Sequence, residues 1–269
     1  MPVADLHTHS HFSDGTCSPE EVVHSALKSG VQVFSLTDHD TMDGTEQARA
    51  ICEARGLKFV PGVEISTCDH DHLHFTGYNI NVHDAGFQAF LADNRQARQR
   101  RIRQVIKQLQ EAGVDLTEED VFSRAPNTVS RAHVADALKA KGFADSRQHA
   151  FRKYLVEGQP GYVAPIGVSA VEAIRRIKQA GGVAVIAHPG MVVEQWNFPV
   201  WTEAGLDGIE VFYPAHTFAM RQELLALVRK YGLFASAGSD YHGPKSGRTT
   251  TPGMQIPQDH FNKLLSKLF

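Results

Sequence analysis

Residues 3–9 read Val3-Ala4-Asp5-Leu6-His7-Thr8-His9, a short apolar strand that runs directly into two histidines. Residues i and i+2 of a strand lie on the same face, so His7 and His9 can bind one cation together. The same arrangement recurs: residues 31–36 precede Asp38-His39, residues 59–63 precede Glu64, and residues 183–187 precede His188. The repetition predicts strands that each end in a metal ligand.

Strands that each end in a candidate ligand predict one shared metal site. In an α/β barrel the carboxyl ends of successive strands converge on one mouth, where such folds hold their catalytic residues. Imidazoles and carboxylates are the usual ligands of zinc, manganese and ferrous iron, and a carboxylate such as Glu64 can bridge two ions. A single histidine after a strand is as often a hydrogen-bonded core or cap residue, but the whole set favours a polynuclear metal centre.

The composition is that of a globular protein with one main domain. With 269 residues, of which 42% are hydrophobic, the chain has the length of one α/β barrel with a small insertion. The formal net charge of -3 argues against a surface that coats DNA or RNA, but it leaves room for a local basic patch.

Cysteine usage and hydropathy predict the compartment. Cys17, Cys52 and Cys68 form no CxxC pair and no even-numbered framework, which predicts a reducing compartment. Cys68 lies near a ligand segment and is interpreted as a small, partly buried thiol, with a soft metal ligand as the alternative. Because no signal segment or membrane-spanning stretch is found, we expect a cytoplasmic protein without a membrane partner. The sequence does not determine the oligomeric state.

The first part of the chain alternates between strands and helices. Ser18-Pro19-Glu20-Glu21 is typical of a capping box with proline at the first helical position, so a helix is predicted to begin at Pro19. A strand at 31–37, a helix at 44–55 and a strand at 58–65 favour parallel strands joined by helical crossovers. Residues 73–80 predict a further strand that carries His74.

The pattern changes at Gly86. One long helical segment to about Ala112 and shorter ones near 117–124, 130–141 and 146–154 predict a helical insertion that faces the substrate. A turn cluster at 158–161 closes it, and the alternation resumes at Ser169. The predicted domains are therefore a split barrel, 1–85 and 161–269, that carries the metal site, and an insertion, 86–160.

The motifs are specific enough to name a family. The chain resembles the PHP family, the polymerase and histidinol phosphatase metal-dependent phosphoesterases, and most of all its bacterial branch of 3',5'-nucleotide bisphosphate phosphatases and a 5'-to-3' exoribonuclease. The matching segments are Asp5-Leu6-His7-Thr8-His9-Ser10, Ser13-Asp14-Gly15, Leu36-Thr37-Asp38-His39-Asp40, Pro61-Gly62-Val63-Glu64, Ser130-Arg131-Ala132-His133, Tyr154-Leu155, Pro160-Gly161-Tyr162-Val163 and Gly238-Ser239-Asp240.

This resemblance implies a distorted seven-stranded (β/α) barrel that binds two or three divalent ions, commonly manganese, with zinc or ferrous iron as alternatives. The implied ligands are His7, His9, Glu64 and Asp240 for one ion, Glu64, His74 and His188 for a second, and Asp14, His39 and His242 for a third. The implied catalytic residues are His7, His9, Glu64, His188 and Asp240.

The implied chemistry needs no side-chain nucleophile. Bridging metals lower the pKa of bound water, so that hydroxide attacks the phosphoryl group at neutral pH. The sequence contains no GxSxG elbow and no P-loop, which would have indicated other mechanisms.

Cationic residues of the insertion are candidate substrate contacts. In the helix near residue 100, Arg95 and Arg98 lie on the side of the packed apolar stripe, whereas Arg100, Arg103 and Lys107 point away. Arg131 and His133 lie at a helix start, where a guanidinium and backbone donors can share a phosphate. The predicted substrate-binding residues are Arg98, Arg131 and His133.

Two positions depart from the family branch. Met191 stands where relatives commonly carry an arginine that could contact a phosphate, and Arg248 and Lys245 are the candidates to substitute for it. His72 shares a strand face with His74 and could lie in the mouth of the site, but it is left out of the ligand set.

The leading hypothesis is hydrolysis of the 3'-phosphate of nucleoside 3',5'-bisphosphates. The first alternative is a 5'-to-3' exoribonuclease acting on a 5'-monophosphorylated RNA end, for which Phe212, Tyr213 and Phe218 could stack bases, although core packing is the more common use of each. Histidinol phosphatase activity and a non-catalytic PHP module are further alternatives. The intact ligand set argues against the module.

Overall fold

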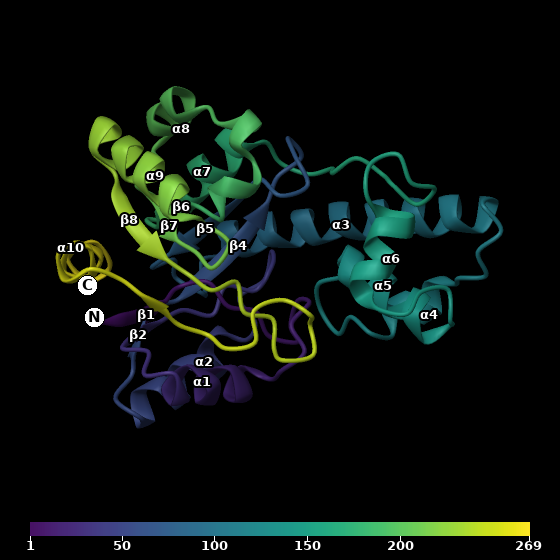
Figure 1. Cartoon of the computed structure of the whole chain (residues 1–269), viewed down its shortest axis with the longest axis horizontal. Helices are drawn as coiled ribbons and strands as arrows, with labels where there is room; N and C mark the ends of the chain where they lie inside the picture. Colours follow the sequence, from purple (N-terminus) through teal and green to yellow (C-terminus); the bar gives the residue numbers. More distant parts are fainter.

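The centre of the larger lobe is formed by two β-sheets, as seen in a computed structural model that describes residues 1–269 (Figure 1). One sheet has the order β3-β2-β1-β9 and the other the order β4-β5-β6-β7-β8. The strands are β1 (Val3–Asp5), β2 (Val33–Phe34), β3 (Lys58–Phe59), β4 (Gly62–Ser66), β5 (His74–Tyr78), β6 (Val183–Ile186), β7 (Gly208–Phe212), β8 (Phe234–Ala237) and β9 (Met254–Gln255).

Backbone contacts join the two sheets at both sides. The amide of Leu6 donates to the carbonyl of Ala237 over 2.9 Å, next to an isolated bridge between Thr8 and Tyr241. A second isolated bridge joins His39 to Glu64. The structure is therefore a mixed α/β fold in two sheets, and a single closed ladder of seven strands, as the sequence predicted, is not seen.

The parallel arrangement predicted from the sequence is correct for only some of the strands. β1, β2 and β3 are parallel, and so are β6, β7 and β8. In contrast, β4 and β5 are antiparallel, with Glu64 opposite Thr76, because the connection between them is too short for a helical crossover. The strand predicted at 58–65 is two strands in different sheets, separated at Pro61, which lacks an amide donor.

Helices cover the outer faces of the sheets, as Figure 1 shows. They are α1 (Pro19–Lys28), α2 (Thr45–Ala54), α7 (Ala170–Gln179), α8 (Phe198–Ala204), α9 (Phe218–Tyr231) and α10 (Gln258–Leu268). The predicted helix start at Pro19 is confirmed: Ser18 and Glu21 form a reciprocal capping box. The amphipathic α7 buries Ala173, Ile174 and Ile177 against the core.

A second, helical lobe lies to one side of the first and is attached by a long helix (Figure 1). Its elements are α3 (Ala85–Glu111), α4 (Glu118–Phe122), α5 (Arg131–Ala140), α6 (Arg147–Ala150) and a π-helical turn at Phe151–Leu155. The first turns of α3 pack Phe87 and Leu91 into the core of the larger lobe, whereas Ile102 and Leu109 belong to a separate core of the helical lobe. Since α3 contributes to both cores, the predicted domain boundaries at 86 and 160 stay a prediction.

None of the helices combines the length and the apolar composition that crossing a membrane requires.

Candidate metal centre

The side chains predicted to be metal ligands lie together in the structure. They form four overlapping groups, and within each group the ligand atoms lie within 4.8 Å of one another. The groups are His9, Asp14, His39 and His242; His7, His9 and Asp240; His7, Glu64 and His188; and His39, Glu64 and His74. Their role as ligands stays a prediction, but the fold brings every one of them to one place.

Several of these residues follow the carboxyl ends of strands, whereas Glu64, expected at the end of a strand, lies inside β4 and His74 is the first residue of β5. His7 and His9 follow β1, His188 follows β6, and Asp240 follows β8. His188 and Asp240 have positive φ angles of 31° and 53°, and so does Asp40, at 52°. A left-handed backbone at residues other than glycine costs about 1–3 kcal/mol and tends to occur at functional sites.

Glu64 lies at the centre of the cluster. Its Oε2 atom is 3.3 Å from His7 Nε2, 3.2 Å from His9 Nε2 and 2.9 Å from His39 Nδ1. Its Oε1 atom is 2.9 Å from His74 Nδ1 and 3.1 Å from His188 Nε2. Each oxygen therefore faces a different set of histidines, which is the geometry that a carboxylate bridging two cations needs.

Several of these buried atoms have no hydrogen-bond partner. Among them are His7 Nε2, His9 Nε2, Asp14 Oδ1 and Glu64 Oε2. Buried polar atoms in proteins are almost always hydrogen-bonded, so a group of unpartnered nitrogen and oxygen atoms that face one another calls for a shared ligand. Divalent cations fit this set of imidazole nitrogens and carboxylate oxygens.

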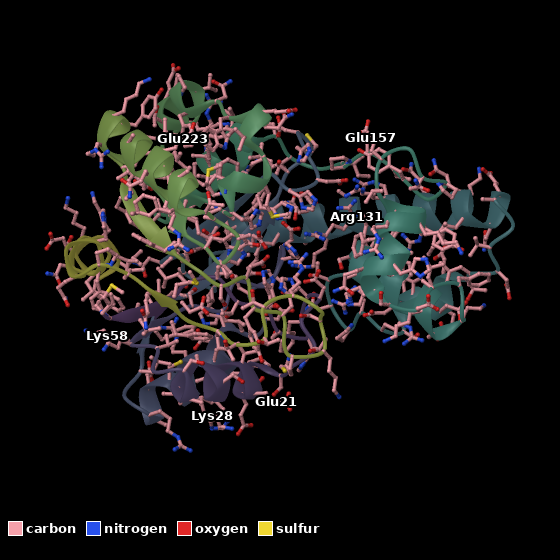
Figure 2. All side chains as sticks on the ribbon, viewed as in Figure 1. Glu21, Lys28, Lys58, Arg131, Glu157 and Glu223 are labelled. Carbon is pink, nitrogen blue, oxygen red and sulfur yellow. The ribbon has the colours of Figure 1, made fainter.

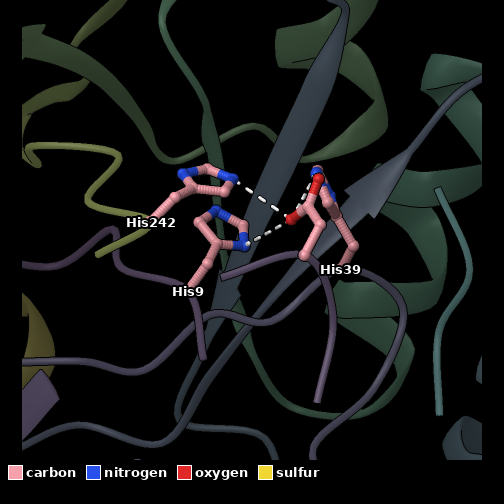
Figure 3. A group of neighbouring side chains, drawn as sticks. His9, His39 and His242 are labelled. Atoms are coloured by element: carbon pink, nitrogen blue, oxygen red, sulfur yellow. Dashed lines mark ion pairs between the residues drawn. The ribbon is translucent and has the colours of Figure 1, made fainter. Parts of the chain in front are cut away.

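Asp14 forms the centre of a second part of the cluster, shown in Figure 3 with His9, His39 and His242 around a carboxylate. Asp14 Oδ1 is 3.1 Å from His242 Nε2 and 3.9 Å from both His9 Nδ1 and His39 Nε2. The sequence-based grouping placed His9 with another ion; in the structure His9 lies between the two parts.

The pKa values of the buried residues in the cluster also indicate a site for cations. Burial raises the pKa values of Asp14, Glu64 and Asp240, but the neighbouring histidines, and Arg248 in the case of Asp240, outweigh it and hold these pKa values well below the usual range. Burial lowers the pKa of His9, yet the carboxylates of Asp240 and Glu64 raise it to about 9. Buried carboxylates of this kind require positive charge beside them, which cations would supply.

Two further carboxylates lie behind the candidate ligands: Glu210, which the sequence analysis missed, and Asp38, to which it gave no separate role. Glu210, inside β7, accepts a hydrogen bond from His7 Nδ1 at 3.0 Å and another from the amide of His188 at 2.7 Å. Asp38 accepts hydrogen bonds from the hydroxyls of Ser10 and Ser13, both at 2.6 Å. A carboxylate within the apolar run Gly208–Phe212 was the available signal for Glu210, because an acid in a buried strand needs a partner.

A cavity between the two lobes adjoins the cluster and is lined by four arginines: Arg98, Arg101, Arg131 and Arg248. Figure 2 labels Arg131 on the side of the helical lobe nearest the larger lobe. Its Nη1 donates to Asp71 Oδ2 at 2.7 Å, and Arg101 binds the other oxygen of the same carboxylate. The cavity therefore combines basic side chains with the edge of the cluster, as an anion-binding site would.

The basic residues of α3 other than Arg101 do not pair with Asp71. Arg98 donates to Asp40 Oδ2 at 2.5 Å, and Arg95 donates to the carbonyl of Asp40 at 2.9 Å. Arg103 and Lys107 point to solvent and pair with exposed glutamates. Among the predicted substrate contacts the structure thus brings Arg98 and Arg131 to the cavity, together with Arg101, which the sequence analysis had not singled out.

His133 does not line the cavity. Its Nδ1 accepts a hydrogen bond of 3.0 Å from the amide of Ser130 in the capping box of α5. The structure therefore gives His133 a local structural contact, and its role in substrate binding stays a prediction. His72 does lie in the mouth of the site, where burial and the charges of His74 and Arg131 lower its pKa to about 3.

A second cavity also adjoins the cluster and shares His39, His72, His74 and Arg248 with the first. Met191, Tyr213 and Pro214 contribute to its wall, and Arg248 lines both cavities. Arg248 Nη1 donates to Asp240 Oδ2 at 2.8 Å. Of the two candidates to substitute for an arginine at position 191, Arg248 lines the same cavity as Met191, whereas Lys245 does not. Of the three proposed aromatic platforms only Tyr213 faces this cavity; Phe212 is in the core and Phe218 is 78% exposed.

The chain is similar to known proteins over most of its length. The PHP domain model matches residues 5–157. The chain is 35% identical to a 3',5'-nucleoside bisphosphate phosphatase of Chromobacterium violaceum, covering 92% of this chain and 90% of that protein. It is 36% identical to a 5'-3' exoribonuclease of Escherichia coli, covering 90% and 86%. A solved structure from Bifidobacterium adolescentis, described as a metal-dependent phosphoesterase, matches with a TM-score of 0.88 and 29% identity over 98% of this chain and 96% of that one.

Proposed function

The chain belongs to the PHP domain family and is a metal-dependent hydrolase, and from that premise we propose that it removes the 3'-phosphate from nucleoside 3',5'-bisphosphates. The observation that carries this proposal is the position of the arginine-lined cavity, which directly adjoins the candidate metal centre. A substrate with two phosphates can place one at each.

The candidate metal ligands would hold the reacting phosphate. Bound divalent ions would supply a water of lowered pKa and positive charge that offsets the negative charge of the phosphoryl oxygens. Glu64 orients the cluster by facing three histidines with one carboxylate oxygen and two with the other. Glu210 fixes His7 and the backbone at His188 from the opposite side.

The arginines would hold the second phosphate. Arg131 uses only its Nη1 atom for Asp71 and for the carbonyl of Leu155, which leaves its other N–H groups free to bind an anion. Guanidinium groups bind phosphate oxygens in pairs of parallel hydrogen bonds, which gives both strength and orientation. Arg98 and Arg101 contribute further positive charge to the same cavity.

The test is phosphate release by manganese-loaded protein from adenosine 3',5'-bisphosphate and from adenosine 3'-monophosphate. We expect the bisphosphate to be preferred, and we expect Arg131→Ala to lose that preference by raising KM for the bisphosphate about tenfold or more, roughly 1.4 kcal/mol. Arg103→Ala, which removes an exposed arginine paired with Glu118, is the control. Equal use of both substrates by the wild-type protein would contradict the proposal.

A second candidate function is 5'-to-3' exoribonuclease activity. It is favoured by the second cavity, where Met191, Tyr213 and Pro214 offer space beyond the cluster for the continuing RNA chain. A 5'-monophosphorylated oligonucleotide with products resolved by length distinguishes the two functions. Stepwise shortening with little bisphosphate turnover would assign the exoribonuclease.

Further parts of the proposal are manganese as the resident ion, a cytoplasmic location, and a small nucleotide or an RNA end as the partner. A seven-stranded barrel is also proposed. It is supported by the contacts between the sheets at Thr8 and Tyr241 and at His39 and Glu64, which lie where ladders closing the barrel would run.

A further inference from the structure

The helical lobe reaches into the candidate metal centre through one residue. Ser130, the N-cap of α5, donates a hydrogen bond from Oγ to Asp14 Oδ2 over 3.1 Å. Both residues are 5% exposed. The two positions are 116 residues apart in the sequence and belong to different lobes.

The hydroxyl of Ser130 is held in a fixed orientation. Its oxygen accepts the amide of Ala132 at 3.1 Å, as expected of an N-cap. The nearest other acceptor, His133 Nδ1 at 3.4 Å, already uses its lone pair for a backbone amide, so the single proton of the hydroxyl goes to Asp14. The backbone amide of Ser130 donates to His133 Nδ1 at 3.0 Å. Two residues earlier, the amide of Thr128 donates to the carbonyl of Phe12 at 3.1 Å, which ties this segment to the loop that carries Asp14.

The two oxygens of Asp14 have different surroundings. Oδ2 accepts the hydrogen bond from Ser130, whereas Oδ1 faces His9, His39 and His242 and has no hydrogen-bond partner. A carboxylate with one oxygen fixed from behind presents the other at a defined position. This is how hydrogen bonds from neighbouring residues orient metal ligands and tune their affinity.

We propose that Ser130 is a positioning residue for Asp14, so that the helical lobe completes the cation site formed by Asp14, His39 and His242. The inference rests on the proposed metal centre. It gives the helical lobe a role beyond holding substrate: the position of α5 and the affinity of this one ion depend on each other. Because Arg131 directly follows Ser130, the same helix start also carries a substrate contact.

The test is a titration of the metal-free protein with Mn²⁺, followed by calorimetry and without substrate. We expect Ser130→Ala to weaken the binding of one ion about 10- to 100-fold and to leave the other ions within about twofold of wild type. Ser130→Thr, which keeps a hydroxyl and a capping oxygen, should restore the affinity. Ser146→Ala is the matched control, because Ser146 caps α6 in the same lobe and does not contact the cluster.

Three outcomes would overturn the proposal. One is a Ser130→Ala variant that binds all ions as the wild type does while its KM rises, since Ser130 would then act on substrate. Another is equal weakening of every ion, or weakening in Ser146→Ala as well, since the effect would then be general. The third is a wild-type protein that binds no ion through Asp14. The titration contains no nucleotide, so a wrong substrate assignment would leave its result unchanged.

Discussion

Glu210 Oε1 accepts a hydrogen bond of 3.0 Å from His7 Nδ1, although 203 residues separate the two positions. Because a carboxylate can only accept, this contact places the proton of the neutral imidazole on Nδ1 and leaves Nε2 as the atom that faces Glu64 and Asp240. The second oxygen of Glu210 accepts the amide of His188. One buried carboxylate therefore orients two parts of the candidate metal centre.

Glu210→Gln should weaken metal binding. The amide places a second donor beside the N–H of His7 or of His188, so one of these contacts is lost, and the loss of such an orienting partner typically lowers metal affinity about 10- to 100-fold. Calorimetric titration with Mn²⁺ measures this. Glu223→Gln, on an exposed position of α9 (labelled in Figure 2), is the control, and equal affinity in both variants would contradict the assigned role.

Gly238→Ala should disrupt the same contact. A Cβ atom at Gly238 would collide with Glu210 Oε1 and with the Cβ of His7, both of which are buried. We expect a loss of about 1–3 kcal/mol in the free energy of unfolding and weaker metal binding. Gly86→Ala serves as the control, because its Cβ would meet only Asp84 Oδ1, at 3.4 Å. Urea denaturation compares the variants, and a stable Gly238→Ala protein with full metal content would refute this prediction.

Asp71→Asn should loosen the connection between the lobes. Arg101 and Arg131 lose their shared carboxylate, at a cost of about 2 kcal/mol in the free energy of unfolding at pH 7. Burial raises the pKa of Asp71, but the two arginines lower it below 3.8, its ordinary value. The ionised Asp71 carboxylate therefore stabilises the folded protein fully at pH values above its ordinary pKa. This stabilisation is lost as the pH falls through the lower pKa of the folded state.

Urea denaturation between pH 7 and pH 3 tests this dependence. The difference between wild type and Asp71→Asn should be constant down to about pH 4 and should narrow below it. Asp145→Asn is the control, since Asp145 is an exposed carboxylate of the helical lobe. If the difference in unfolding free energy between wild type and Asp71→Asn grew as the pH fell, the prediction would be contradicted.

Removal of metal should lower the thermal stability. An ion that binds only the folded protein stabilises it by about 4 kcal/mol when its concentration is 1,000 times Kd. We therefore expect a chelator to lower Tm in the wild-type protein and added Mn²⁺ to restore it. In Glu64→Ala, which lacks the central carboxylate, Tm should hardly respond to either, and a full response in that variant would contradict the predicted ligand set.

Cys52 should be unreactive in the folded protein. It is fully buried, and burial together with Glu53 raises the pKa of its thiol to about 12, so its thiolate is scarce at pH 8. Titration with a chromogenic disulfide should count at most Cys17 and Cys68 before denaturation and all three thiols after it. Cys52→Ala should leave the native count unchanged; a lower count would mean that Cys52 is accessible.

Local features of the sequence were predicted well. The capping box at Ser18 and the long helix from residue 86 depend on neighbouring residues and agree with the structure to within one residue. The strand-end pattern and the family resemblance together selected the histidines and carboxylates that the fold gathers. Strand pairing was predicted less well: β4 and β5 form an antiparallel pair where a parallel arrangement was expected. Alternating hydrophobicity shows which face of a strand is buried but not which strand lies beside it.

The sequence by itself determined the chemistry of the site, because residue types and their spacing along single strands are local properties. Only the tertiary structure decided which groups hold those residues in place. Glu210 behind His7, Ser130 behind Asp14 and the pairing of Arg101 with Asp71 each join segments that lie far apart in the chain or in different lobes. Such contacts follow from how strands and helices pack against one another, and no periodicity within one segment records them.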